Sequence, residues 1–186
     1  MYEIEFIGRG GQGAKSAAEI VARQAIKKGL FIQSFPDYGP ERKGAPVRAF
    51  TRTSKAPIRG CSSEADPDIV VVIDPTLLSL NGSFFKLKDD AILLANYSGS
   101  PEKLKEQINF NGKIYTVNAT AIALKYLKSP ITNTTMLGAL SKVSNYYTLE
   151  ELEKEIRDEF ARKLRPEIIE KNIEAANEAY NQVKGI

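Results

Sequence analysis

The sequence predicts an α/β fold with three layers, in which a mostly parallel β-sheet lies between helices, followed by a C-terminal helical extension. Three observations lead to this prediction: a strand, glycine-rich turn and helix at the start, continuous apolar runs in the middle, and strongly amphipathic helices at the end. We expect a single domain over residues 1–186, with an α/β core over residues 1–130 and C-terminal helices over residues 131–186.

The first 35 residues predict a strand, a helix and a second strand. Apolar residues alternate with glutamates from Tyr2 to Phe6 and lead to a glycine turn at Gly8. Residues 14–28 are rich in alanine and carry apolar side chains at helical spacing, and the glycine that follows is typical of a helix end. Because residues 30–35 return to strand character, we expect a βαβ unit with a right-handed parallel crossover.

The middle of the chain predicts further strands. Residues 36–44 contain two prolines and two glycines, which predicts a loop at the ligand-binding side of the sheet. Residues 47–53 alternate apolar and basic residues, as in a strand exposed on one face. Continuous apolar runs at 69–73, 91–95 and 114–117 are typical of parallel strands that are covered on both faces.

Helices dominate the rest of the chain. Pro75 is expected to start a short helix, and residues 120–127 predict another. Three more are expected in the C-terminal part, over residues 135–143, 149–164 and 166–184.

The composition excludes several classes of catalytic centre. The chain has no histidine and a single cysteine, Cys61, so it cannot form an internal disulfide, a Cys/His zinc cluster or a cysteine-ligated iron–sulfur cluster by itself. The absence of histidine also excludes Ser-His-Asp and Cys-His catalysis. Any chemistry of this chain must therefore use carboxylates, lysines or borrowed cofactors, and we assign no catalytic residue or metal ligand to the chain.

The charge pattern and hydropathy restrict the class of partner. Residues 36–60 hold six lysines and arginines against two acids, a local excess that exceeds the net charge of +3 of the whole chain. This concentration indicates a local anion site and not a nucleic-acid surface. The longest apolar run, at 69–73, is far shorter than the roughly 20 residues that span a bilayer, and the start shows no signal-peptide pattern. We expect a cytoplasmic protein without membrane contact.

A glycine motif follows the first strand. Gly8, Gly10 and Gly13 match G-x-G-x-x-G, with an additional glycine at Gly11, in the strand-to-helix context of a Rossmann-like fold. Such a loop allows close approach of a ligand, and the helix N-terminus favours an anion. The alternative is that these glycines only permit a tight turn.

A dinucleotide site requires one more residue. An acid should follow the last glycine by about 20 residues. That position falls near Gln33 and Ser34, and the nearest acid, Asp37, lies in the proline-rich loop, which weakens the NAD interpretation.

A second group of candidate residues is the adjacent pair Arg42 and Lys43. They are predicted to leave the second strand at the same sheet edge as the glycine loop. A bidentate guanidinium beside a mobile ammonium suits a diphosphate or a 3′-phosphate. The alternative is a solvated basic loop that pairs with Asp37 and Glu41.

Other polar residues are assigned simpler roles. Arg48, Arg52 and Arg59 could extend the basic patch, but we expect them on exposed strand faces or paired with acids of a partner chain. Asp74 and Asn96 follow strands, where they could line a crevice or cap the next helices.

Several blocks together resemble the gamma subunit of pyruvate:ferredoxin oxidoreductase. They occur in order over nearly the whole chain: residues 8–13, 38–47, 67–74 and 133–139, and a charged helix from about Leu149. The resemblance implies that a 2-oxoacid, coenzyme A and oxidised ferredoxin give acyl-CoA, carbon dioxide and reduced ferredoxin.

The resemblance also implies cofactors and partners. Thiamine diphosphate, magnesium and iron–sulfur clusters are expected in sister subunits only, and coenzyme A is expected to be bound partly by this chain, through the glycine loop, Arg42 and Lys43. Alpha, beta and ferredoxin-like delta subunits are the expected partners. Pyruvate is the expected substrate, although related enzymes for other 2-oxoacids use a similar domain. The alternatives are a purely structural assembly subunit and a free-standing NAD(P)-dependent oxidoreductase.

Overall fold

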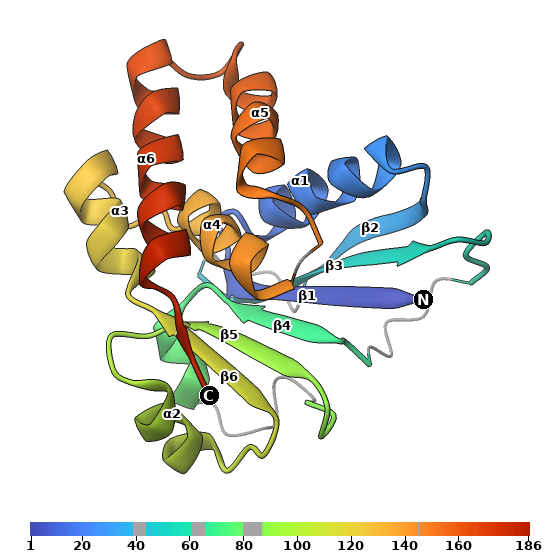
Figure 1. Cartoon of the computed structure of the whole chain (residues 1–186), viewed down its shortest axis with the longest axis vertical. Coiled ribbons are helices and arrows are strands. Elements are labelled where there is room, and N and C mark those ends of the chain that lie inside the picture. The colour runs from blue at the N-terminus through green and yellow to red at the C-terminus, as the bar shows by residue number, and fades with distance from the viewer. Residues whose placement is uncertain (39–43, 61–65, 80–86, 145) are drawn as a thin grey trace.

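A computed structural model of the chain describes residues 1–38, 44–60, 66–79, 87–144 and 146–186. Strands in these residues form one seven-stranded sheet in the order β2-β3-β1-β4-β5-β6-β7 (Figure 1). The strands are β1 (Tyr2–Arg9), β2 (Phe31–Tyr38), β3 (Pro46–Ser54), β4 (Ile69–Val72), β5 (Ile92–Asn96), β6 (Lys113–Val117) and β7 (Lys184–Gly185).

Helices cover both faces of the sheet, which gives the predicted three layers (Figure 1). The helices are α1 (Ala14–Lys27), the 3₁₀ helix η1 (Pro75–Ser79), α2 (Pro101–Ile108), α3 (Ala119–Leu127), α4 (Asn133–Ser144), α5 (Leu149–Phe160) and α6 (Pro166–Gln182). Apolar residues of α1, α3, α4, α5 and α6 share one core with one face of the sheet. Residues of η1 and α2 form a second core with the other face.

The three apolar runs form the parallel centre of the sheet, as predicted. β4 pairs in parallel with β1 and β5, and β5 pairs in parallel with β6. All four residues of β4 are buried. Because both faces of these strands are covered, their sequences lack the alternation of a half-exposed strand.

The N-terminal strands are arranged differently from a simple βαβ unit. β3 is antiparallel to both β1 and β2, so β1 and β2 run in the same direction but are separated by β3. The short connection between β2 and β3 favours an antiparallel hairpin, because a parallel neighbour needs a longer crossover. The expectation that β3 has an exposed face is wrong, because Phe50 and Arg52 are buried there.

Strand β2 is longer than the predicted 30–35. It continues through Pro36, which pairs in register with Ala49, and ends at Tyr38. Proline lacks a backbone donor but is tolerated in an edge strand, and β2 lies at the edge of the sheet.

Two elements lack a counterpart in the prediction. α2 begins with proline at its first turn and contains Glu102 there, both ordinary start signals. β7 has only two residues and pairs antiparallel with β6, so it is too short to show a periodic pattern. None of the helices in the described residues combines the length and apolar character needed to cross a bilayer.

Candidate functional site

The glycine loop connects β1 to α1 at the carboxyl edge of the parallel strands. Gly11 and Gly13 have φ angles of +93° and +83°, in the left-handed region that favours glycine. Gly13 is also the N-cap of α1, where it offers no side chain to the helix, and the first turn contains no acid. The N-terminus of α1 therefore keeps a positive dipole end that neither a capping side chain nor an acid of its own first turn neutralises.

Gly13 also has a packing role. A Cβ atom at this position would lie 2.5 Å from Nδ2 of Asn133, the first residue of α4. Asn133 is itself buried. The N-terminus of α4 therefore packs directly on the glycine loop, and any side chain at residue 13 would push it away.

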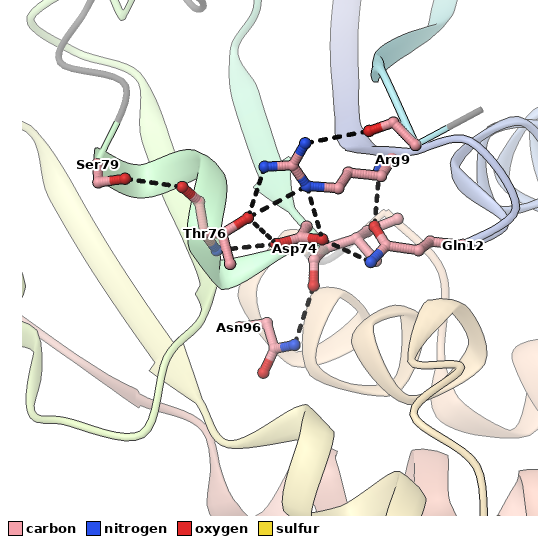
Figure 2. Close-up of polar contacts among 8 residues, drawn as sticks. Arg9, Gln12, Asp74, Thr76, Ser79 and Asn96 are labelled. Atoms are coloured by element: carbon pink, nitrogen blue, oxygen red, sulfur yellow. Dashed lines mark hydrogen bonds and ion pairs between the residues drawn. The ribbon is translucent and has the colours of Figure 1, made fainter. Parts of the chain in front are cut away.

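Gln12 holds the loop in shape (Figure 2). Its Oε1 accepts a hydrogen bond from the backbone N–H of Arg9 at 2.7 Å. Its Nε2 donates to Oδ2 of Asp74 at 2.6 Å. Because the two ends of the amide have different partners, the orientation of the Gln12 side chain is fixed, and the loop is tied to the residue that follows β4.

Asp74 is buried and fully engaged with neighbouring donors. Its Oδ1 accepts from the backbone N–H and the hydroxyl of Thr76, at 2.8 and 2.6 Å, which caps η1. Burial alone would raise the pKa of the Asp74 carboxyl, but hydrogen bonds from Thr76 and Gln12 and the charge of Arg9 lower it overall. Of the two predicted roles for Asp74, the structure supports the helix cap.

Arg9 links the glycine loop to two other segments (Figure 2). Its Nε and Nη2 donate to the Thr76 hydroxyl at 3.2 and 2.8 Å, and its Nε lies 3.4 Å from Oδ2 of Asp74. Its Nη1 donates to the carbonyl of Gly44 at 3.0 Å. The backbone N–H of Gly10 donates to the carbonyl of Ala45 at 3.1 Å. The start of the β3 segment is therefore bonded to the glycine loop.

Asn96 bonds to the first turn of α3, whose N-cap is Asn118, and not to α2, the next helix, which it was predicted to cap. Its Nδ2 donates to the carbonyl of Ile73 and to the hydroxyl of Thr120, each at 2.9 Å. Its Oδ1 accepts from the backbone N–H of Thr120 at 3.2 Å. Asn96 thereby connects the ends of β4 and β5 to the first turn of α3.

The predicted site residues fall into two groups. Gly8, Gly10, Gly11 and Gly13 lie together in the loop, whereas Arg42 and Lys43 lie outside the described residues. The described residues on both sides of Arg42 and Lys43 are at the same sheet edge, because Tyr38 pairs with Val47 and Arg9 with Pro46.

The expectation that Arg48 and Arg52 pair with acids of a partner chain is wrong. They form ion pairs with Glu5 and Glu3 of the adjacent strand β1, not with a partner chain. Burial raises the pKa of Glu5 above its usual value, and the hydrogen bond from Arg48 opposes this shift. The basic excess of residues 36–60 is therefore partly neutralised inside the chain, whereas Arg59 is exposed as expected.

The polar network around Arg9 was not predicted from the sequence. It joins Arg9, Gln12 and Thr76, which were not expected to interact. Arg9 and Gln12 stand at the variable positions of the glycine motif, and Thr76 lies more than 60 residues away. A polar residue at a variable position is a weak signal until the ends of β1 and β4 are known to be adjacent.

Comparison with known proteins identifies the relatives of the chain. Residues 3–182 match the family described as pyruvate ferredoxin/flavodoxin oxidoreductase. The chain is 46% identical to pyruvate synthase subunit PorC of Thermotoga maritima, over 98% of this chain and 95% of that one. It is 45% identical to the pyruvate/ketoisovalerate oxidoreductases common subunit gamma of Thermococcus kodakarensis, over 98% and 97% of the two chains.

A solved structure gives the same relationship. The crystal structure of the pyruvate oxidoreductase subunit PORC from Thermotoga maritima superposes with a TM-score of 0.85 at 43% identity, and the match covers 99% of this chain and 97% of that one. Both the sequence and the fold thus match over almost the full length. The chain belongs to the pyruvate ferredoxin/flavodoxin oxidoreductase family, as a gamma-type subunit.

Proposed function

We propose that this subunit supplies part of the coenzyme A-binding surface of a 2-oxoacid:ferredoxin oxidoreductase and contributes to its assembly. The complex would convert a 2-oxoacid, with pyruvate as the expected substrate, to acyl-CoA and reduce ferredoxin. Three features that meet at one sheet edge carry the proposal. They are the glycine loop, the uncapped N-terminus of α1, and the described residues on either side of Arg42 and Lys43.

The chemistry of this edge suits the phosphates of coenzyme A. Gly11 is exposed, and a Cβ atom there would meet no atom within 4 Å, so the loop surface is open at this point. The α1 dipole favours an anion, and Arg42 and Lys43 would add two positive charges. A diphosphate and a 3′-phosphate together offer enough negative charge to engage both features.

The names of the relatives support a role that does not depend on the choice of 2-oxoacid. The Thermococcus kodakarensis relative is described as a gamma subunit common to pyruvate and ketoisovalerate oxidoreductases. A subunit shared by two enzymes contributes what their reactions have in common. In the reaction proposed here coenzyme A is such a common reactant, whereas the 2-oxoacid differs between the two enzymes.

The remaining cofactors are assigned to partner subunits. With one cysteine and no histidine, this chain lacks the residues for an iron–sulfur cluster of its own. We assign thiamine diphosphate with its magnesium ion, and the iron–sulfur clusters, to the partner subunits.

The test uses the assembled complex with Arg42→Ala and Lys43→Ala in this subunit. Loss of charge-assisted hydrogen bonds should raise the apparent KM for coenzyme A about tenfold to a hundredfold, with kcat and the KM for the 2-oxoacid unchanged. Lys55→Ala and Arg59→Ala are matched controls, because both side chains are exposed in the same basic segment. These controls should leave the KM for coenzyme A unchanged.

A purely structural role is the second candidate function. It is favoured by the contact of Gly13 with Asn133 and by the bond from Gly10 to Ala45, which use the loop to hold the fold. An intact complex with an unchanged KM for coenzyme A in the Arg42→Ala, Lys43→Ala variant would support this function and contradict ours. Loss of partner subunits from the same variant would identify the segment as an assembly contact.

A free-standing NAD(P)-dependent oxidoreductase is disfavoured by the sheet order. In a dinucleotide site the acid at the end of the second strand reaches the ribose from the strand next to β1. Here β3 lies between β1 and β2, which places the end of β2 about 10 Å from β1 instead of about 5 Å. A titration of the purified subunit with NAD(P) should show no binding.

A further inference from the structure

We infer that Arg9 is a positioning residue that fixes the segment beginning at Gly44 against the glycine loop. The effect of this positioning on coenzyme A kinetics rests on the proposed function, because Gly44 directly follows Lys43 in the sequence.

The pairing of β1 with β3 ends where Arg9 begins to act. Arg9 and Pro46 are the last pair in the register, and proline has no backbone N–H to extend it. Two further bonds continue the connection beyond the ladder: Gly10 N–H to the Ala45 carbonyl, and Arg9 Nη1 to the Gly44 carbonyl. Beyond the last backbone pair, the side chain of Arg9 therefore connects the glycine loop to the segment that precedes β3.

The orientation of Arg9 is determined by groups around Asp74. The single hydroxyl hydrogen of Thr76 is donated to Oδ1 of Asp74, so its oxygen lone pairs are left to accept from Nε and Nη2 of Arg9. The Asp74 charge lies 3.4 Å from the Arg9 Nε and balances the guanidinium. Figure 2 shows how Arg9 lies between Thr76 and the carbonyl opposite it.

A guanidinium is required for this arrangement. Its planar fork donates to Thr76 on one side and to Gly44 on the other, and these partners lie 67 and 35 residues after Arg9 in the sequence. A lysine ammonium is a single point charge on a flexible stem and would reach one of the two partners at a time. Arg9→Lys therefore keeps the charge beside Asp74 but loses one of the two connections.

The test compares Arg9→Ala and Arg9→Lys in the assembled complex. Arg23→Ala is the matched control, because the Arg23 side chain is 35% exposed against 36% for Arg9 and also pairs with carboxylates, Glu155 and Glu159. Arg23 is on α1 and its partners are on α5, away from the glycine loop. A general loss of stability should appear in all variants, whereas a loss of positioning should appear only at Arg9.

Two measurements are made on each complex. Hydrogen exchange should become about tenfold faster in peptides covering Gly10 and residues 44–47 for Arg9→Ala, less for Arg9→Lys, and not at all for Arg23→Ala. The apparent KM for coenzyme A should rise about five- to tenfold for Arg9→Ala with kcat unchanged, and Arg9→Lys should fall between it and the wild type.

The outcomes separate this inference from the proposed function. Faster exchange at residues 44–47 with an unchanged KM for coenzyme A would uphold the positioning role and contradict the coenzyme A surface. Unchanged exchange there, or equal acceleration in Arg23→Ala, would overturn the positioning role whatever the KM. Where Arg9→Ala does not assemble, Arg9→Lys carries the same comparison.

Discussion

The side chain of Asp74 receives three hydrogen bonds beside the glycine loop. Gln12 donates to one of its oxygens, Thr76 donates twice to the other, and Arg9 adds a positive charge. Each of these groups is a donor or a cation, so the site selects an ionised acid. The pKa of Asp74 is lowered in the folded protein, so the ionised form of this side chain contributes to the free energy of unfolding.

The substitution Asp74→Asn should destabilise the subunit and flatten its acid response. In the variant an amide NH₂ replaces one carboxylate oxygen and faces the donors that this oxygen accepted from. The free energy of unfolding at pH 7 should therefore be lower by about 2 kcal/mol. The folded pKa of Asp74 lies below its usual 3.8, so its contribution is present above that pH and lost as the pH falls. Urea unfolding should be measured between about pH 3 and pH 7. As the pH falls over this range, the free energy of unfolding should decrease less in the variant than in the wild type. An equally steep acid limb in both proteins would contradict this account.

At Gly13 the obstacle to a side chain is another side chain. Gly13→Ala should lower the free energy of unfolding by more than Gly29→Ala, because Gly29 also has positive φ but would place its Cβ in open space. The Gly29 change should cost about 1–2 kcal/mol of backbone strain, and the excess at Gly13 measures the clash with Asn133. Thermal unfolding of both variants and of Gly13→Ala with Asn133→Ala should show that the double substitution removes most of the excess, because the Asn133 Nδ2 and Cγ atoms at 2.5 and 2.8 Å are lost while Cβ at 3.1 Å remains.

The sequence motif predicts part of this site and misses the rest for a physical reason. G-x-G-x-x-G predicts a tight strand-to-helix turn, and the loop has that form, with left-handed backbone at Gly11 and Gly13. The contact of Gly13 with Asn133 joins residues that are far apart in sequence, and its existence depends on where α4 packs. The bonds of Arg9 to Thr76 and Gly44 depend in the same way on the order of β1, β3 and β4.

At the scale of secondary-structure elements, α4 and α6 pack closely together at Gly138. A Cβ atom there would overlap the backbone carbonyl of Ala176 on α6. Alanine favours a helix by about 1 kcal/mol over glycine, but here the gain is exceeded by the overlap. Small residues therefore determine how near the two helices lie.

The substitution Gly138→Ala should lower the free energy of unfolding by about 1–3 kcal/mol, measured by urea or thermal unfolding. Adding Ala176→Gly should give no recovery, because the obstructing atoms belong to the backbone of α6. This result would contrast with the recovery expected at Gly13, where a side chain is removed. Recovery with Ala176→Gly would show that the helices are held apart by side chains instead.

The elements predicted best are those whose pattern depends only on burial. The apolar runs of β4, β5 and β6 were identified because both faces of these strands are covered. The position of β3 was missed, although Glu3 and Glu5 lie on one face of β1 and Arg48 and Arg52 lie on one face of β3. Opposite charges gathered on one face of each of two strands are a signal for pairing, and here they form the ion pairs between β1 and β3.

The whole molecule is held together by a core that crosses the expected boundary at residue 130. Apolar residues of β1, α1 and β4 share one cluster with those of α4, α5 and α6. Polar contacts follow the same path, because Glu155 on α5 accepts from both Arg23 and Lys27 on α1. Such shared burial predicts that the C-terminal helices and the sheet unfold together.

Glu155→Gln tests this cooperation. The Glu155 side chain is 3% exposed, and glutamine can accept from only one of its two cationic partners, so we expect a loss of about 3 kcal/mol in the free energy of unfolding. Glu170→Gln is the control, because the Arg157–Glu170 pair is exposed and its loss should cost less than about 1 kcal/mol.

Unfolding should be followed by far-ultraviolet circular dichroism, which reports the helices, and by tyrosine fluorescence, which reports both parts of the chain. If one core holds both parts, the two signals shift together to a lower midpoint in Glu155→Gln, because weakening α5 weakens the sheet to the same extent. Two separated transitions would show instead that residues 131–186 unfold independently of residues 1–130. The contact of α5 with α1 would then join two parts that are each stable without it.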